Sequence, residues 1–328
     1  MTLFSFVLLQ PDTYIYIGWG VLAFLSLVVL LLCRFIRRRR WKRLLLLLPL
    51  LLLWGVFLWG TYVGFGQLEV VHLTFASRDL PEAFDGYRIV QFGDAHVGTY
   101  TGSRQEILER AVDSINAQQA DLVVFTGDLQ NKEPSEILEA KPILSRIKAA
   151  DGVVSVLGNH DYTMYTDLTN PIEIDTNQGR TENYQLDMGW KLLLNSRFRI
   201  RRDSASIVIA GMENDGEGRF PQMGNISSTL YGVSRSEFVV MLEHDPTSWR
   251  RKILPHCHAQ LTLSGHTHGG QLSLFGLTPA MFMYREYQGM YYAGERALYV
   301  TKGLGGVVPF RFGVKPEIAV ITLRRITN

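Results

Sequence analysis

Five short apolar segments, each followed at once by polar residues, constrain the fold of this chain more than any other feature. Their length and their content of Val, Leu and Ile predict buried strands. Amphipathic segments alternate with these strands, which predicts an α/β fold in one domain. The five segments are RIVQF (88–92), DLVVF (121–125), GVVSVL (152–157), EFVVML (237–242) and AQLTLS (259–264).

Two helices and one further strand are predicted around these segments. Residues 103–118 place their apolar side chains on one face, and Ser103 and Glu106 have the spacing of a capping box. Residues 133–150 form the second predicted helix, which Pro142 must break or kink. Residues 70–75 are a further predicted strand.

The polar residues that follow the five strands are candidate ligands. In open α/β sheets, the loops at the carboxyl ends of the strands converge on a ligand site, so we expect these side chains to lie together. In chain order they are Asp94 and His96, then Asp128, then Asn159, His160 and Asp161, then His244, and finally His266 and His268.

Seven of these residues suit a pair of metal ions. They supply two carboxylates, one amide oxygen and four imidazoles, a mixture suited to Mn, Fe, Zn or Mg. A tetrahedral ion takes about four ligands, so seven groups indicate two divalent ions. Such pairs, about 3.5 to 4 Å apart, serve in-line attack on phosphorus. The seven are Asp94, His96, Asp128, Asn159, His244, His266 and His268.

Glycines stand between several predicted strands and their candidate ligands. Gly93, Gly127, Gly158 and Gly265 each fall where the chain must turn sharply at a strand end. We expect them to let the backbone approach the site without a Cβ in the way.

Residues 1–66 are predicted to be a membrane anchor. Residues 13–33 and 44–65 are uncharged and apolar, each long enough to cross about 30 Å of hydrocarbon as a helix. No Lys or Arg precedes the first segment, unlike a cleaved signal peptide. Seven Arg and Lys residues lie in the hairpin 34–43 instead. For a protein integral to a bacterial plasma membrane, this charge places the hairpin in the cytoplasm and residues 67–328 on the extracytoplasmic face.

The remaining charge argues against nucleic acid as a partner. From Leu44 onward, 26 basic residues face 30 acidic ones, so this part of the chain is mildly acidic. A nucleic-acid binder needs a basic stripe, which is missing here. The hairpin cations suit the anionic headgroups of membrane lipids.

The ordered motifs GDAH, GD, GNHD, a later His and GHTH resemble the calcineurin-like metallophosphoesterase superfamily. LSGHTHGGQ (263–271) and GLGGVVPFRFGVKPEI (303–318) are similar to its membrane-anchored bacterial phosphodiesterase branch, which includes enzymes resembling UDP-2,3-diacylglucosamine pyrophosphatases. The resemblance covers residues 70–328. It implies a four-layer sandwich of two mixed sheets flanked by helices, and a metal-dependent phosphoric ester hydrolase.

The resemblance also implies a role for each candidate residue. Asp128 is the expected bridge, with one oxygen for each ion, and the bridging hydroxide attacks a phosphodiester or pyrophosphate bond. His160 lies near the leaving-group oxygen, with Asp161 orienting its ring. The first metal is expected on Asp94, His96, Asp128 and His268, and the second on Asp128, Asn159, His244 and His266.

Residues outside these motifs receive weaker assignments. Arg311 and Lys302 are charged donors that we assign to substrate binding. Glu243 precedes His244 and is expected to add negative charge near the second metal. His256 and His258 precede a strand instead of following one, so we interpret them as surface imidazoles. Tyr162, Tyr165 and the segment 281–292 are assigned to packing in preference to an apolar mouth.

The substrate class remains open between alternatives. A phosphoester is expected, with a lipid-linked diester or pyrophosphate favoured because a membrane tether concentrates an enzyme at lipid headgroups. One rival is a cytoplasm-facing lipid pyrophosphatase of the UDP-diacylglucosamine type. A rival from another class is a metal-binding scaffold without turnover.

Overall fold

The predicted strands form two six-stranded sheets in the computed structural model, which describes residues 8–35 and 40–327. The first sheet has the order β1 (Glu69–Ser77), β12 (Glu317–Arg325), β2 (Arg88–Phe92), β3 (Leu122–Phe125), β4 (Val153–Ser155), β5 (Lys191–Leu192). The second has the order β10 (Gly289–Ala293), β11 (Arg296–Val300), β9 (Leu261–Ser264), β8 (Phe238–Leu242), β7 (Ala205–Gly211), β6 (Ser196–Arg202).

Both sheets are mixed, as the family resemblance implies. In the first, β2 to β5 run parallel while β12 is antiparallel to β2. In the second, β7, β8, β9 and β11 run parallel, and β6 and β10 pair antiparallel at its edges. All six strands predicted from the sequence are present, with ends displaced by two residues at most.

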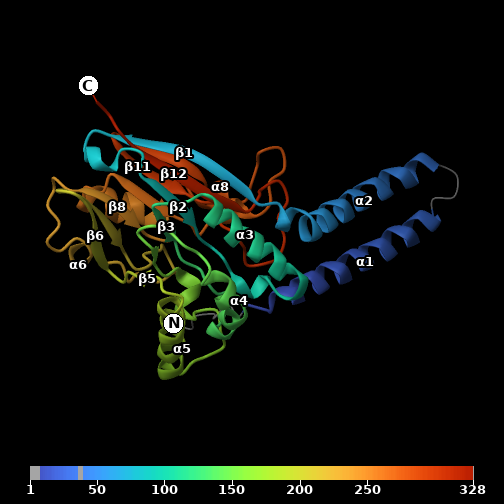
Figure 1. Cartoon of the computed structure of the whole chain (residues 1–328). Coiled ribbons are helices and arrows are strands. Elements are labelled where there is room, and N and C mark those ends of the chain that lie inside the picture. Colours follow the sequence, from blue (N-terminus) through green and yellow to red (C-terminus); the bar gives the residue numbers. More distant parts are fainter. Residues whose placement is uncertain (1–7, 36–39, 328) are drawn as a thin grey trace.

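Three apolar layers hold the sheets and helices together as a four-layer sandwich. The central layer lies between the two sheets and contains Ile89, Val240 and Leu261. A second layer packs the first sheet against α3 (Gln105–Ala117) and α4 (Ile137–Leu144). The third packs the second sheet against the π-helix Trp249–Ile253, which continues into α7 (Leu254–His256). Figure 1 shows the two sheets stacked, with α3 and α4 covering the first. The short helices α6 (Ile226–Thr229) and α8 (Ala280–Met283) lie in loops.

The helix ends differ from the predictions. The predicted capping box is wrong, because Ser103 lies in a 3₁₀ turn (Gly102–Arg104) and α3 starts at Gln105 without a side-chain cap. The second predicted helix is shorter than expected. A 3₁₀ turn (Pro134–Glu136) leads into α4, which ends at Leu144, two residues after Pro142. A helix α5 (Pro171–Asp187), capped by Asn170, was not predicted.

Two long helices project from the sandwich as a hairpin (Figure 1). They are α1 (Pro11–Phe35) and α2 (Arg40–Tyr62), joined by the segment 36–39, which lies outside the described residues. Their apolar spans run over Pro11–Arg34 and Leu44–Gly66, with only 6% and 11% of the residues buried. Because a core helix would be mostly buried, these helices have the length and exposure of membrane spans. Trp54 Nε1 donates to Ser26 Oγ at 3.0 Å between them.

Both ends of the hairpin are fixed to the sandwich. Before α1, the amide N–H of Leu8 donates to the carbonyl oxygen of Tyr165 at 3.1 Å. After α2, Phe65 enters the apolar layer beneath the first sheet. The N–H of Arg311 also donates to the carbonyl oxygen of Gly60 at 2.9 Å, so the last turn of α2 contacts a late loop.

The junction after α2 leaves no room for a side chain at Gly64. A Cβ on this residue would lie 1.9 Å from the backbone oxygen of Arg311. We therefore expect Gly64→Ala to destabilise the full chain by about 1–3 kcal/mol. Its thermal unfolding midpoint in detergent should fall clearly below that of the unmodified protein.

Gly179 provides the matched control, because it lies in α5 and a Cβ there would meet nothing within 4 Å. Gly179→Ala should raise stability by about 0.5–1 kcal/mol through helix propensity alone. Equal midpoints for the two variants would contradict the close packing at the junction.

Candidate active site

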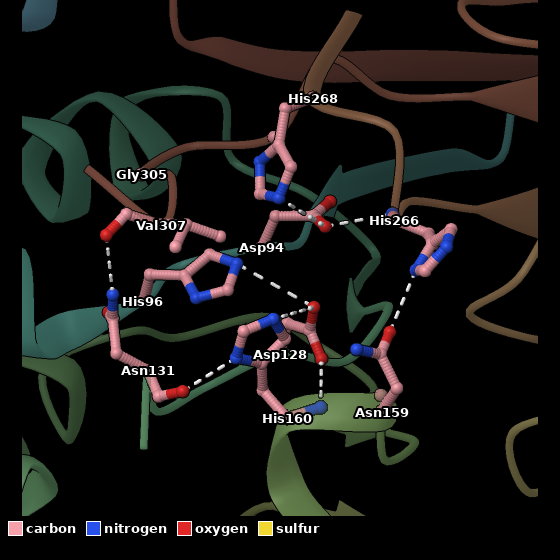
Figure 2. Close-up of polar contacts among 12 residues, drawn as sticks. Asp94, His96, Asp128, Asn131, Asn159, His160, His266, His268, Gly305 and Val307 are labelled. Atoms are coloured by element: carbon pink, nitrogen blue, oxygen red, sulfur yellow. Dashed lines mark hydrogen bonds and ion pairs between the residues drawn. The ribbon is translucent and has the colours of Figure 1, made fainter. Parts of the chain in front are cut away.

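The five loops that follow β2, β3, β4, β8 and β9 meet at one edge of the sandwich. Figure 2 shows side chains from both sheets pointing toward a common centre. The structure brings together all seven residues that the sequence predicts as metal ligands, and buries every one of them. They are Asp94, His96, Asp128, Asn159, His244, His266 and His268.

One group of ligand atoms comes from Asp94, His96, Asp128 and His268. Each residue offers one atom within 4.8 Å of those of the others. His96 Nε2 lies 3.6 Å from Asp128 Oδ2, and His268 Nε2 lies 3.7 Å from Asp94 Oδ1. This membership matches the set expected for a first metal.

A second group combines Asp128 with His244, His266 and Asn159. Asp128, His244 and His266 offer atoms within 4.8 Å of one another. Asn159 Oδ1 completes the group, at 2.7 Å from His266 Nδ1 and 3.1 Å from His244 Nε2. His266 thus turns Nδ1 toward the group, while its Nε2 lies 3.1 Å from the hydroxyl of Tyr284.

A single oxygen of Asp128 connects the two groups. Oδ2 lies 3.2 Å from His244 Nε2 in the second group and 3.6 Å from His96 Nε2 in the first. Oδ1 instead accepts a hydrogen bond from the backbone N–H of His160 at 2.8 Å. This geometry favours a bridge through Oδ2 over the expected arrangement of one carboxylate oxygen for each ion, because Oδ1 is already engaged by the turn at His160.

Several buried polar atoms in the site lack a hydrogen-bond partner among residues 8–35 and 40–327. They are both ring nitrogens of His96, Asp94 Oδ2 and His268 Nδ1. Buried polar atoms are seldom left unpaired, and a divalent cation would satisfy groups of this kind. Burial also holds the pKa values of His96 and His268 well below the usual range. Both rings are therefore neutral, as metal ligands must be.

The pKa of His244 is raised, unlike those of His96 and His268. Burial lowers its pKa, but the neighbouring Asp128 carboxylate outweighs burial and raises the value to about 10. Its Nδ1–H donates to the carbonyl oxygen of Thr126 at 2.7 Å, which directs Nε2 toward Asp128. Binding of a cation at Nε2 would release the second proton.

His160 lies beside the first group, but Asp161 does not orient it as expected. Nδ1–H of His160 donates to the carbonyl oxygen of Asn131 at 2.5 Å, and Nε2 lies 4.0 Å from Asp128 Oδ2. Its ring stacks on Tyr165, with ring centroids 4.1 Å apart. The sequence carries no signal for a backbone carbonyl partner, which explains why the role of Asn131 was missed.

The Asp161 carboxylate holds the loop that carries Asp128. It accepts hydrogen bonds from the backbone N–H groups of Asp128, Leu129 and Gly158, each at 2.9 Å. Asp161 therefore positions the Asp128 carboxylate and does not contact the ring of His160. This assignment replaces the catalytic role expected from its place in the GNHD motif.

The backbone at the site is strained where the candidate ligands stand. A positive φ is uncommon outside glycine, and such residues cluster at functional sites when the surrounding structure holds them there. Five candidate ligands adopt it here: Asp94, His96, Asp128, His266 and His268.

The glycines at the strand ends allow the close approach that the sequence predicts. A Cβ on Gly158 would lie 2.3 Å from Asp128 Oδ1, and one on Gly265 would lie 2.3 Å from Asp94 Oδ2. One on Gly93 would meet Thr126 Oγ1 at 2.3 Å, and Gly127 has a φ of +91°. Each glycine thus lets a ligand loop pack against its neighbour.

The structure does not support substrate binding by Arg311 or Lys302. Arg311 is fully buried and donates to the carbonyl oxygens of His268, Gly303 and Gly305. It holds the His268 loop against the loop at 303–305. Lys302 Nζ pairs with Glu69 at 2.8 Å and with Glu317 at 2.9 Å.

Glu243 is buried, and its carboxyl group is engaged in hydrogen bonds within the protein. Its carboxyl group accepts hydrogen bonds from the backbone N–H of Asp215 and the hydroxyl of Ser248. Burial raises the pKa of Glu243 well above its usual range. This shift opposes the negative charge that the residue was expected to add near the second metal.

His256 and His258 lie away from the two ligand groups. His256 is exposed, and a ring nitrogen of His258 lies 3.2 Å from the carbonyl oxygen of Glu237. Neither residue belongs to a cluster of three or more His, Cys, Asp or Glu at metal-binding distance within the described chain.

Gly158 offers a test of the ligand geometry that keeps every candidate ligand. We expect Gly158→Ala to lower Mn²⁺ affinity by at least about tenfold, because the new methyl group displaces the Asp128 carboxylate and even small shifts of ligands weaken a site. Calorimetric titration of the metal-stripped full chain measures this effect. Gly179→Ala should titrate like the unmodified protein, and unchanged affinity in Gly158→Ala would contradict the role of Asp128.

Comparison with known proteins identifies the family. The model of the calcineurin-like phosphoesterase family matches residues 87–270. The uncharacterized metallophosphoesterase YkuE of Bacillus subtilis (strain 168) is 33% identical over 82% of this chain and 90% of its own length. A Danio rerio transmembrane protein with metallophosphoesterase domain is 32% identical over 78% of this chain and 57% of its own length. The crystal structure of phosphopantetheinyl hydrolase (PptH) from Mycobacterium tuberculosis aligns with a TM-score of 0.43 at 12% identity, covering 68% and 91% of the two chains. The chain belongs to the calcineurin-like phosphoesterase family and is a metal-dependent phosphoester hydrolase.

Proposed function

We propose that this enzyme hydrolyses phosphodiester or pyrophosphate bonds with two divalent ions. The proposal rests on the position of Asp128 Oδ2, which lies within reach of both ligand groups. This oxygen is 3.6 Å from His96 Nε2 in the first group and 3.2 Å from His244 Nε2 in the second. The first ion is assigned to Asp94, His96, Asp128 and His268. The second is assigned to Asp128, Asn159, His244 and His266.

A bound ion pair supplies an activated water and neutralises charge on the phosphoryl oxygens. The protein contributes the positions of its own groups. Asp161 and Gly158 hold the Asp128 loop, and Thr126 and Asn131 hold the rings of His244 and His160. These contacts exist before any substrate arrives, so the site is preorganised.

His160 is assigned to proton transfer at the leaving-group oxygen. The proton on Nδ1 is committed to the carbonyl oxygen of Asn131, so only Nε2 can exchange a proton with a substrate. Burial lowers the pKa of His160, so the ring readily gives up a proton carried on Nε2. Stacking on Tyr165 fixes the direction of that atom.

We further propose that residues 1–66 anchor residues 67–328 to a bacterial plasma membrane, with the catalytic part on the extracytoplasmic face. The exposure of α1 and α2 and the basic residues 34–43 support this topology. The relative named as a transmembrane protein with metallophosphoesterase domain is in keeping with it. A lipid-linked substrate is favoured, including a lipid pyrophosphate of the kind used by UDP-diacylglucosamine pyrophosphatases.

The activity is tested on the full chain in detergent, since Leu8 and Gly60 both bond to the catalytic part. Metal-stripped protein refilled with Mn²⁺ should hydrolyse bis(p-nitrophenyl) phosphate faster than p-nitrophenyl phosphate. His160→Ala should lower kcat by about 10²–10⁴-fold with its metal content unchanged, because it removes one proton-transfer group. Asp128→Asn should lose both metal and turnover.

His256→Ala is the matched control, because this histidine is exposed and outside the ligand groups. It should retain full activity and metal content. Equal activity of the His160→Ala variant, or turnover that survives chelation of the metal, would refute the proposed mechanism.

The topology is tested by a reporter at the carboxyl terminus. Alkaline phosphatase fused there should be active in a bacterial host, because it becomes active only after export. A green fluorescent reporter should be dark, because it fluoresces only when it stays in the cytoplasm. The reverse pattern would favour the cytoplasm-facing lipid pyrophosphatase. Replacing the basic hairpin residues with neutral ones provides the control. A larger share of the chains should then insert with the carboxyl terminus in the cytoplasm, while the catalytic site stays unchanged.

A further inference from the structure

The loop before Tyr284 exposes an unusual amount of apolar surface. Residues 271–284 contain no charged side chain. We call residues 272–283 the apolar loop. Within it Phe275 is fully exposed, Phe282 is 81% exposed and Met283 is 72% exposed. Large apolar side chains exposed in one uncharged loop of this kind are candidates for an interaction surface.

The tip of the apolar loop presents an aromatic side chain at a local conformational cost. Leu274 and Leu277 exchange backbone hydrogen bonds of 3.0 Å, which closes a two-residue turn. Phe275 and Gly276 at its centre have φ values of +53° and +82°. This type I′ geometry favours Asn-Gly, and a bulky residue at positive φ is rare. Phe275 therefore costs stability locally and contributes no packing within the described chain.

The apolar loop lies beside the base of the helical hairpin. The N–H of Ser273 donates to the carbonyl oxygen of Phe312 at 2.7 Å, and Arg311, one residue earlier, donates to Gly60 in α2. A Cβ on Gly60 would lie 2.2 Å from the ring of Phe310. The segment 310–312 thus connects the last turn of α2 with the apolar loop. Figure 1 shows loops from the last third of the chain beside this end of α2.

The apolar loop also leads into the metal site. Tyr284 follows it directly, and the Tyr284 hydroxyl lies 3.1 Å from Nε2 of His266. The two rings meet edge to face, with centroids 5.4 Å apart. Tyr284 therefore connects the end of the apolar loop to His266 of the second ligand group.

We propose that the apolar loop inserts into the leaflet that holds the last turn of α2, as a second membrane contact beside the hairpin. The occupant of this surface is bilayer lipid, and the substrate class is an amphiphilic phosphoester whose headgroup reaches His266 past Tyr284. Aromatic side chains favour the membrane interface, and continuity with the hairpin places Phe275 at that level. This inference rests on the proposed membrane anchoring.

The test measures membrane depth at single sites with a nitroxide label. Full-length protein in which Cys33 and Cys257 are replaced by Ala receives one new cysteine and is reconstituted in phosphatidylcholine vesicles. Phe275→Cys reports the apolar loop, Phe24→Cys in the middle of α1 reports the hairpin, and Tyr231→Cys reports exposed surface distant from α2. Collisions with oxygen and with a water-soluble nickel complex are compared at each site.

The label at 275 should collide more with oxygen than with nickel, as the label at 24 does, whereas the label at 231 should favour nickel. Nickel access at 275 equal to that at 231 overturns the inference. If the label at 24 is then in lipid, the proposed anchoring survives alone. If it is in water, the anchoring fails as well.

Phe275→Asn gives a second readout, because Asn-Gly suits the turn and removes only the aromatic ring. The ratio of turnover on a lipid phosphoester in vesicles to turnover on bis(p-nitrophenyl) phosphate should fall by about threefold or more, given the transfer energy of a phenyl group. Tyr231→Asn should leave the ratio unchanged. An unchanged ratio in Phe275→Asn would overturn access from the membrane.

Discussion

The apolar layer between the two sheets is the constraint on which the active site depends. Side chains such as Ile89 and Leu261 hold the sheets face to face, with the carboxyl ends of β2, β3, β4, β8 and β9 at one edge. Gln91 adds a polar link there, donating from Nε2 to the carbonyl oxygen of Ser264 at 2.9 Å. Close to this link, the backbone N–H of His266 donates to Asp94 Oδ1 at 2.8 Å, although the two residues are 172 positions apart.

Two buried ionisable side chains, Asp161 and Arg311, support the ligand loops from behind. Asp161 accepts backbone N–H groups around Asp128, and Arg311 donates to carbonyl oxygens around His268. A buried charge is costly unless hydrogen bonds compensate it, and both groups are compensated by main-chain atoms of the ligand loops. These hydrogen bonds help to hold Asp128 and His268 at their positive φ angles.

The sequence predicted the strands and all seven grouped residues because both follow from local patterns, whereas the two-sheet sandwich came from the family resemblance. Apolar runs mark buried strands, and the ligands stand at fixed offsets after them. Chain position could not reveal side-chain partners, so Asp161, Arg311 and Lys302 were misassigned. Asp161 binds the loop of Asp128, Arg311 binds the loop of His268, and Lys302 pairs with Glu317 in β12, contacts that only the tertiary fold creates. Helix ends were also misplaced, because the 3₁₀ turn at Gly102–Arg104 overrode the spacing of Ser103 and Glu106. The contacts of His160 and His244 with backbone carbonyls leave no trace in residue identity.

The attachment of the hairpin at both ends has a mechanical consequence. Leu8 bonds to the residue whose ring stacks on His160, and α2 passes through Phe65 into the core without a flexible linker. Under the proposed membrane anchoring, these attachments hold the sandwich at a fixed height above the bilayer. The enzyme then meets a membrane-borne substrate by lateral diffusion in two dimensions, with its active site already oriented relative to the bilayer.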